Sequence, residues 1–350
     1  MNKVICEDVD NILALPLPWE KLYGKTVLIA GATSMLASYM AFVVAELGRR
    51  NPENGLRLIL GVRNIQKAHD LFGTLLNEPQ VEVWNVDFTT LFSFDRHVDY
   101  IVHAASITRN DLYLVNPVQV TLPNSLGTWQ LLELARREKA DGFLYFSSGA
   151  VYGKIEDKTV INEEDNGKLQ PMDIRSCYGE SKRFGENLCA AYAAQYKVPA
   201  NSVRISHTYG PTLDLNDSRV FCEFVKNAVC GEDIVMKSEG LARRPFCYIT
   251  DAVEAFFRIL FSGVYGEAFN MCNNDGYCSI HELACLLAGL YPEKNMRVVR
   301  VEREPSSVYY EDSNAFEQRI DCSKLQALGW SPRVPLKDGF RRTVESFLHE

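Results

Sequence analysis

Residues 26–38 read TVLIAGATSMLAS, an apolar strand that runs into a glycine turn and then opens a helix. Gly31 permits the tight turn, and the free N–H groups at the helix N-terminus suit a pyrophosphate. The other two glycine positions of the pattern GxxGxxG hold Ser34 and Ala37. Ala37 still lets helix and strand approach, whereas the Ser34 side chain stands where backbone should come near phosphate. The stretch predicts a dinucleotide-binding turn, with a plain α/β turn as the alternative.

Apolar runs alternate with stretches of helical period along the first two thirds of the chain. We expect strands at 26–30, 57–62, 81–86, 100–105, 143–147 and 202–206. Helices are expected near 35–49, 64–77, 117–138, 177–196, 219–230, 250–262, 279–289 and 335–348. This alternation indicates an α/β fold with a doubly wound parallel sheet that carries helices on both faces.

The regular alternation breaks after about residue 207, which suggests a second, smaller unit. We expect residues 1–23 to be an N-terminal extension laid against the body. Residues 24–206 form the expected dinucleotide-binding domain, joined by a returning segment near 246–265. Residues 207–350 are then mostly a substrate-binding lobe, placed beyond the carboxyl ends of the strands, where ligands collect in such sheets.

Composition limits the classes of partner. The 350 residues are 47% hydrophobic and carry a formal charge of −8, so a polyanion such as nucleic acid would be repelled. Ten cysteines without a CxxC pair suit reduced thiols, and together with six dispersed histidines they predict no metal site. The N-terminus MNKVICEDVD does not resemble a signal peptide, and no apolar stretch approaches membrane-spanning length, so we expect a cytoplasmic protein without a membrane partner.

The ends of the strands supply candidate cofactor contacts. Asp87 could accept a bond from an adenine amino group, with a solvated carboxylate as the alternative. No acidic residue ends the second strand, where Arg63 stands instead. A cation there slightly favours NADP over NAD, with an exposed arginine at the start of a helix as the equally common alternative. The expected cofactor-binding residues are Gly31, Thr33, Ser34, Met35, Leu36, Arg63, Asp87, Phe88, Ala104, Ala105, Ser106 and Lys182.

A second set of residues suggests proton transfer. Tyr178 and Lys182 lie four apart in YGESK, about thirty residues after the strand end FSSGAVYG that carries Ser148. A neighbouring ammonium lowers the pKa of a phenol, so Tyr178 could act as a base while Lys182 also holds the cofactor ribose. Ser148 would orient the substrate hydroxyl. Because the Tyr-Lys spacing alone is expected by chance in a chain of this composition, the surrounding motifs must support it.

Those motifs, in their order, resemble the extended short-chain dehydrogenases/reductases, also called the NAD-dependent epimerase/dehydratase family, which modify nucleotide sugars. The resemblance covers about residues 24–345, and within the family the chain is similar to UDP-glucuronate decarboxylases in RSCYGESKRFGEN, LNDSRVFCEFVKNAV and RPFCYI. The family motifs are GATSMLA, HAAS, Asn124 in NSLGT, SSGAVYG, YGESK, HTYGP (207–211) and RRPFCYITDA (243–252).

The resemblance implies roles for particular residues. Ser148, Tyr178 and Lys182 would be catalytic, and Ser148 and Tyr178 would also contact the substrate. Arg244 would grip the diphosphate of a UDP-sugar. Further substrate contacts would come from Arg219, for which a surface ion pair is the alternative, and from His207, for which a core histidine is the alternative. The resemblance also implies a homodimer built from helices beside the sheet, one of them the Tyr178 helix.

The residues after Ser148 bear on the reaction. Family dehydratases have an Asp-Glu pair there, and the decarboxylases keep the glutamate, but this chain has Gly149 and Ala150, which cannot transfer a proton. The chain therefore lacks the acid and the base that supply most of the proton transfer in the removal of water. We rank 4-epimerisation of a nucleoside-diphosphate hexose first, UDP-glucuronate decarboxylation second and NADPH-dependent 4-ketoreduction third. A non-catalytic dinucleotide-binding sensor is the alternative from another class, since Ser34 and Ala150 both depart from the family pattern.

Overall fold

The computed structural model describes residues 2–156, 158–301 and 318–348, and its centre is a seven-stranded sheet in which every neighbouring pair of strands is parallel. The strand order is β11-β7-β5-β4-β1-β2-β3. The bounds are β1 Thr26–Ala30, β2 Arg57–Val62, β3 Val81–Asn85, β4 Tyr100–His103, β5 Gly142–Ser148, β7 Ala200–Ile205 and β11 Ala268–Met271. The expected doubly wound parallel sheet is thus confirmed.

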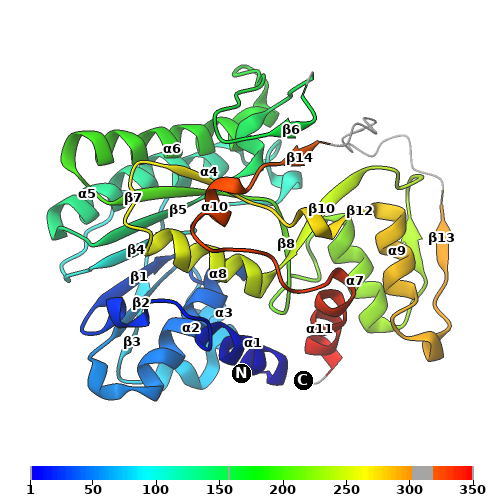
Figure 1. Cartoon of the computed structure of the whole chain (residues 1–350), viewed down its shortest axis with the longest axis horizontal. Coiled ribbons are helices and arrows are strands. Elements are labelled where there is room, and N and C mark those ends of the chain that lie inside the picture. The colour runs from blue at the N-terminus through cyan, green and yellow to red at the C-terminus, as the bar shows by residue number, and fades with distance from the viewer. Residues whose placement is uncertain (1, 157, 302–317, 349–350) are drawn as a thin grey trace.

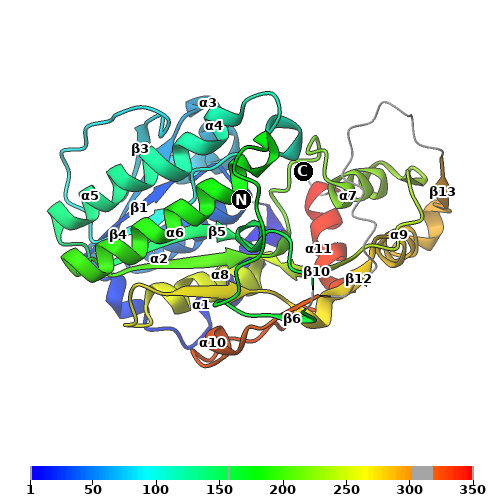
Figure 2. The ribbon, with the colours of Figure 1, turned by 90° about the horizontal axis from the view of Figure 1, so that it is seen from above.

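Helices cover both faces of this sheet (Figures 1 and 2). One face carries α4 (Pro117–Leu122), α5 (Thr128–Glu138) and α6 (Cys177–Tyr196), and the other carries α2 (Met35–Arg50) and α8 (Ile249–Leu260). A short helix, α3 (Ile65–Phe72), follows β2. Because both faces are covered, the central strand β1 is apolar, and its residues 27–30 are at most 1% exposed.

The N-terminal extension contains a helix that the sequence analysis did not predict, α1 (Lys3–Leu13), which packs on α2, α8 and the C-terminal helix α11 (Leu336–Leu348). Asp8 is 1% exposed and accepts hydrogen bonds from Tyr39 at 3.0 Å and Tyr248 at 2.6 Å. It also pairs with Arg342 at 2.7 Å. One buried carboxylate therefore joins both ends of the described chain to the body.

The helix expected over 117–138 is interrupted. Pro123 lacks the N–H of a helical residue and its ring crowds the preceding turn, and residues Pro123–Gly127 form a π-helical turn between α4 and α5. His103 Nε2 lies 3.0 Å from the Pro123 carbonyl, and Asn124 in the turn donates to Ser181 Oγ at 3.1 Å. The interruption thus lies against the end of β4 and the start of α6.

The remaining elements form a smaller lobe beside the carboxyl edge of the sheet (Figure 2). They are α7 (Val220–Cys230), α9 (Ile280–Ala288), α11, the three-stranded sheet β12 (Tyr277–Ser279), β10 (Arg243–Tyr248) and β8 (His207–Tyr209), and the pair β13 (Val298–Arg300) and β9 (Ile234–Met236). From β10 the chain returns to the large sheet, which it covers with α8 and extends with β11.

Short elements complete the description. Strands β14 (Arg319–Ile320) and β6 (Val160–Ile161) pair with each other, and α10 (Ser323–Gln326) follows. Turns of 3-10 helix occupy Trp19–Leu22, Pro52–Asn54, Gly73–Asn77, Asn110–Leu112, Gly149–Tyr152, Ile174–Ser176, Asn274–Gly276 and Pro292–Lys294. Within the described ranges no helix combines the length and the apolar character needed to cross a membrane.

Candidate functional site

The turn after β1 requires glycine. Gly31 has φ +78°, and a Cβ built on it would lie 2.6 Å from the backbone Cα and N of Ala105 and 2.9 Å from the carbonyl carbon of Ala104. Its N–H donates to the Gly61 carbonyl at 2.8 Å. The turn is therefore pressed against the ends of β2 and β4, as a close backbone approach to a dinucleotide requires.

The N-terminus of α2 follows this turn directly. Ser34 is the N-cap, with φ −79° and ψ 153°, and its hydroxyl makes no capping hydrogen bond to the helix. Thr33, Met35 and Leu36 surround the same turn and are partly exposed, while Ala37 is fully buried against the strand. Helix amides without a side-chain cap suit an anion, so these residues fit the pyrophosphate of a dinucleotide.

Other predicted cofactor residues lie at the neighbouring strand ends. Burial by itself would raise the pKa of Asp87, but hydrogen bonds from the Thr89 amide and hydroxyl lower it on balance, and the charge of Arg63 acts in the same direction. Phe88 is buried, so it contributes packing, while Arg63 is exposed. The Ser106 hydroxyl is buried and has no hydrogen-bond partner within the described residues, which leaves it available to a ligand.

The structure brings Ser148, Tyr178 and Lys182 together at the carboxyl edge of the sheet. Ser148 ends β5 and its Oγ accepts from the Ala150 amide at 3.2 Å. Tyr178 is in the first turn of α6, one helical turn before Lys182. The Lys182 ammonium is buried, donates to the Phe146 carbonyl at 2.6 Å and lies 5.6 Å from the centre of the Tyr178 ring.

The electrostatics of this group differ from the expectation. Burial raises the pKa of Tyr178, opposed by a hydrogen bond with the Ser148 hydroxyl and by the charge of Arg219. Burial also lowers the pKa of Lys182 to about 7, so this amine is only partly charged at neutral pH. The prediction that the Lys182 ammonium lowers the pKa of Tyr178 was wrong, because desolvation raises the pKa of Tyr178 and lowers that of Lys182.

The predicted substrate residues also lie together, on the facing lobe. His207 opens β8 beside Phe246 of β10. Burial and then the charges of Arg244 and Arg219 lower its pKa to about 3, so the imidazole is neutral in the physiological range. Arg219 additionally pairs with Asp217 at 2.9 Å, and Arg244 donates to the Arg243 carbonyl at 2.8 Å. Both guanidinium groups therefore act on His207, and the charge of Arg219 also acts on Tyr178.

Sequence analysis missed a residue that covers the predicted base. Tyr113, in the loop after β4, stacks on Tyr178 with ring centroids 5.2 Å apart and an interplanar angle of 15°. Burial raises its pKa above the usual range. The only signal was an aromatic residue in TRNDLYLVNP, a stretch without periodicity.

The sequence predicts no metal site. Among the described residues, no group of three or more histidine, cysteine, aspartate or glutamate side chains could hold a metal ion.

Comparison with known proteins gives the family of this chain. Residues 27–272 match the sequence profile of the NAD dependent epimerase/dehydratase family, and the chain therefore belongs to this family of extended short-chain dehydrogenases/reductases. The proteins described next are similar to this chain in sequence or in structure.

The first relative is UDP-glucuronic acid decarboxylase 6 of Arabidopsis thaliana, 29% identical over 324 residues that cover 92% of this chain and 88% of the relative. The dTDP-D-glucose 4,6-dehydratase of Homo sapiens is 28% identical, with 93% of each chain covered. Among solved structures, epimerase Mth375 of Methanothermobacter thermautotrophicus superposes with a TM-score of 0.77 at 20% identity, covering 99% of this chain and 95% of that chain. UDP-glucuronic acid 4-epimerase of Bacillus cereus in complex with NAD gives 0.73 at 20% identity, covering 92% and 96%.

Proposed function

We propose that this chain modifies a UDP-sugar by oxidation and reduction at carbon 4 of the hexose, with 4-epimerisation as the net reaction. The observation that carries this proposal is the hydrogen-bonded pair of Ser148 and Tyr178, with Lys182 beside it, at the sheet edge that also holds the Gly31 turn. The relatives named above act on nucleotide sugars by their names, which supports the substrate class.

Each residue of the site has a role in this reaction. The nicotinamide of the bound cofactor supplies a reversible hydride acceptor. Tyr178 takes the proton of the 4-hydroxyl and returns it, while Ser148 holds that hydroxyl in line. Lys182 binds the cofactor ribose, and when its amine is protonated, its positive charge stabilises the phenolate of Tyr178. Arg219 and Arg244 bind the diphosphate, a geometry that guanidinium groups favour, and the neutral His207 offers a hydrogen bond to phosphate or sugar.

The residues beside Ser148 distinguish the possible outcomes. A Cβ built on Gly149 would meet nothing within 4 Å, so the turn leaves open space where a family dehydratase has a carboxylate. Neither Gly149 nor Ala150 can transfer a proton, which removes the acid and base that loss of water needs. Open space beside Ser148 allows the 4-keto sugar to turn its other face to the hydride, as epimerisation requires.

Decarboxylation of UDP-glucuronate is the second candidate. A β-keto acid formed by oxidation at carbon 4 loses carbon dioxide without a protein acid, so the absence of a glutamate at Ala150 affects orientation more than chemistry. The similarity to decarboxylases over 92% of the chain favours this candidate. Ketoreduction differs from both because it consumes NADPH.

A substrate panel separates these reactions. We would incubate the protein with UDP-glucuronate, UDP-glucose and UDP-N-acetylglucosamine, with and without NAD or NADPH, and identify products by NMR. The proposal expects a 4-epimer without net consumption of cofactor. Carbon dioxide release would establish the second candidate, and a product formed only with stoichiometric NADPH would establish a ketoreductase. Dinucleotide binding without any product would support a sensor.

We further propose a preference for NADP over NAD. Arg63 follows β2 directly, where a 2′-phosphate would lie, and its positive charge acts on Asp87 at the end of the next strand. No carboxylate at the end of β2 is present to bind a free ribose hydroxyl. Parallel titrations with NADPH and NADH, followed by nicotinamide fluorescence, test this preference; equal affinities would contradict it.

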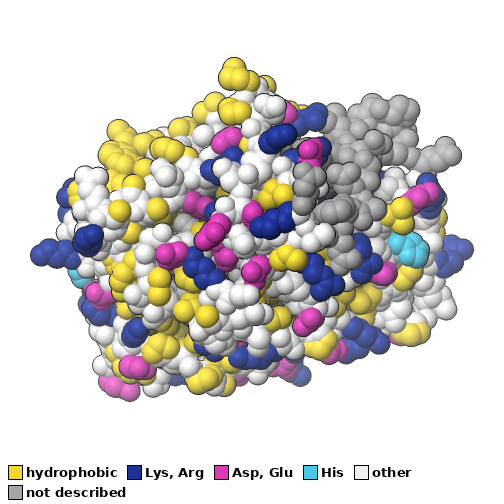
Figure 3. Space-filling model, turned by 45° about the horizontal axis from the view of Figure 1, so that its top comes forward, with side chains coloured by type: hydrophobic (Ala, Val, Ile, Leu, Met, Phe, Trp, Pro, Cys, Tyr) yellow, Lys and Arg dark blue, Asp and Glu magenta, His cyan; other side chains and the backbone are white. Residues whose placement is uncertain are grey.

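We propose that the chain forms a homodimer in the cytoplasm. Apolar side chains gather at the upper left of Figure 3, over the helices that cover this face of the sheet. On α4, α5 and α6 respectively, Val118 is 59%, Trp129 43% and Phe184 50% exposed. None of the ten cysteines, all of which lie within the described residues, forms a disulfide, which suits a reducing compartment. Light scattering should give twice the chain mass, and Phe184→Glu should give the mass of one chain; an unchanged mass would remove this face from consideration.

A further inference from the structure

Helix α6 carries a third side chain on the face that presents Tyr178 and Lys182. Glu186 follows Lys182 by one helical turn, as Lys182 follows Tyr178. The proposed reaction assigns no role to Glu186. Its carboxylate nevertheless contacts the strand that ends in Ser148, so it connects the two elements that build the site.

The contact with β5 is direct. Ser147 Oγ donates to Glu186 Oε1 at 2.6 Å, and Ser147 is 3% exposed and immediately precedes Ser148. Two further bonds join the same segments, since Lys182 donates to the Phe146 carbonyl at 2.6 Å and Arg183 Nε donates to the Val151 carbonyl at 2.6 Å. Helix α6 thus contacts the end of β5 at Phe146 and Ser147 and the turn after it at Val151.

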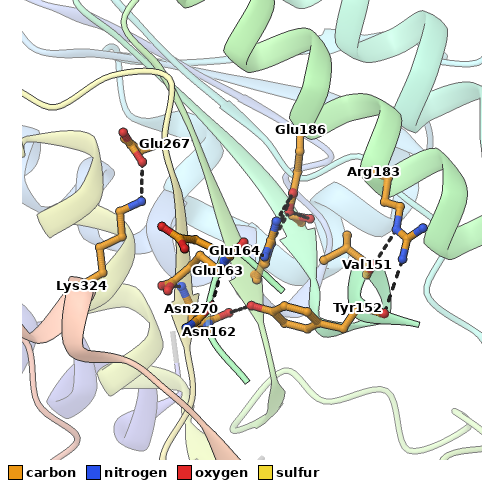
Figure 4. A network of polar contacts seen from close by, with 12 residues as sticks. Val151, Tyr152, Asn162, Glu163, Glu164, Arg183, Glu186, Glu267, Asn270 and Lys324 are labelled. Carbon is orange, nitrogen blue, oxygen red and sulfur yellow. Dashed lines mark hydrogen bonds and ion pairs between the residues drawn. The ribbon is translucent and has the colours of Figure 1, made fainter. Parts of the chain in front are cut away.

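Arg204 of β7 fixes Glu186 from the other side. Its Nε lies 2.9 Å from Glu186 Oε1 and its Nη2 2.8 Å from Oε2, a bidentate pair in which each side chain is 12% exposed. The strand register places Arg204 opposite Ser147. The guanidinium also lies 4.8 Å from the centre of the Tyr152 ring, whose hydroxyl donates to Asn270 at 2.6 Å. Figure 4 shows Glu186 pointing from its helix toward this cluster, with Tyr152 beneath it.

We propose that Glu186 is a positioning residue for the Ser148–Tyr178–Lys182 site, which fixes the end of β5 through Ser147 and supplies a negative charge that acts on Lys182. It contacts neither the proposed substrate nor the proposed cofactor. Because the role concerns the redox residues, it rests on the proposed function, although its effect on Lys182 is measurable without turnover.

The charge of Lys182 depends on the groups that face it from three elements. From α6 these are Tyr178, Glu186 and Cys189, from β5 the Tyr145 ring at 4.8 Å, and from β4 His103. Burial raises the pKa of Cys189 to about 12 and that of Tyr145 well above 10, so both are neutral. Burial and the charge of Lys182 lower the pKa of His103 to about 3, so it is neutral too. Glu186, which forms an ion pair with Arg204, is the carboxylate among these groups, and its charge favours the ammonium.

The test is an NMR titration of protein labelled at lysine Cε. The resonance that disappears in Lys182→Met belongs to Lys182, and in the parent protein it should titrate near pH 7. Glu186→Gln keeps an oxygen that accepts from Ser147 but removes the charge, so the midpoint should fall by about one pH unit. Glu186→Gln/Arg204→Met removes both charges, so its midpoint should lie between those of the parent and the single variant.

A matched control and a complementary variant separate charge from position. Glu133→Gln removes a carboxylate that pairs with Arg136 within α5, and it should leave the Lys182 midpoint unchanged. Ser147→Ala removes the contact with β5 but keeps the Glu186 charge. It should leave the midpoint unchanged and lower kcat for the UDP-sugar roughly tenfold, with dinucleotide affinity retained.

A Lys182 midpoint equal to the parent's in both Glu186 variants would overturn the electrostatic part of the proposal, and full turnover in Ser147→Ala would overturn the positional part. If the single variant does not fold, as judged by circular dichroism, the double variant and Ser147→Ala decide the outcome. A protein that turns over no sugar but shows the expected shift would disprove the proposed function and leave the electrostatic role of Glu186 standing.

Discussion

Gly31→Ala tests the geometry of the dinucleotide turn most sharply. The new Cβ would lie 2.6 Å from two backbone atoms of Ala105, which cannot move without displacing the end of β4. The left-handed backbone at φ +78° costs an L-residue about 1–2 kcal/mol, and overpacking against fixed atoms adds about 1–3 kcal/mol. The free energy of unfolding should therefore fall by about 2–5 kcal/mol, and dinucleotide binding should be lost with the shape of the turn.

Two other glycines separate these contributions. Gly55 lies in the left-handed region with φ +65° and ψ 15°, and a Cβ built on it would meet only the Gly24 Cα at an ordinary 3.7 Å, so Gly55→Ala should cost only the backbone term of about 1–2 kcal/mol. Gly149 has open space and lies outside the left-handed region, so Gly149→Ala should change stability by less than about 0.5 kcal/mol. Urea denaturation and NADH fluorescence provide both measurements. If Gly31→Ala unfolds and binds like Gly149→Ala, the account of the turn is refuted.

Three further predictions concern single side chains. Tyr178→Phe should lower kcat by about 10²–10⁴-fold yet keep dinucleotide affinity, and unchanged turnover by the NMR assay would favour the sensor. Lys182→Met should raise the free energy of unfolding at pH 7 by about 2 kcal/mol. Burial of the Lys182 amine destabilises the folded protein by at most about 5 kcal/mol, and loss of its hydrogen bond to the Phe146 carbonyl offsets part of the gain from its removal. Lys182 keeps its proton up to about pH 10.5 in the unfolded chain but only to about pH 7 in the folded protein, so the stability of the parent should rise with pH between these values. The stability advantage of Lys182→Met in urea denaturation should therefore shrink over the same range. An advantage that stays constant with pH would argue against the lowered pKa of Lys182. Arg63→Ala should weaken NADPH binding about tenfold and NADH binding much less, and an equal effect on both would place the 2′-phosphate elsewhere.

Elements with a strong local pattern were predictable. The strands at 26–30 and 57–62 and the helix at 177–196 have the bounds that the apolar periodicity indicates. Helix α1 was missed although Val4, Ile5, Val9 and Ile12 share one face, because the proline-containing stretch after it suggested an extended segment. The break at Pro123 follows from the missing N–H, but the contact of its carbonyl with His103, twenty residues earlier, has no local signal in the sequence.

The site was predictable only where local motifs carry it. Gly31, Ser148, Tyr178 and Lys182 stand in short stretches whose spacing points to their proposed chemistry. The stack of Tyr113 on Tyr178 depends on how an aperiodic loop folds back. The pair of Glu186 and Arg204 depends on the register that sets Arg204 opposite Ser147, and no local pattern reveals a register. Burial of both partners, which reverses the expected effect on the Tyr178 pKa, is likewise a property of the assembled core.

Reversible removal of hydride from carbon 4 is the central claim, and rapid mixing measures it directly. The protein with bound dinucleotide would be mixed with UDP-glucose or UDP-glucuronate, unlabelled or deuterated at carbon 4, while absorbance at 340 nm reports reduced nicotinamide. We predict a transient rise at 340 nm that forms more slowly with the deuterated sugar and that Tyr178→Phe abolishes. Conversion of the sugar without any reduced nicotinamide, or at equal rates for both isotopes in a single turnover, would contradict the account.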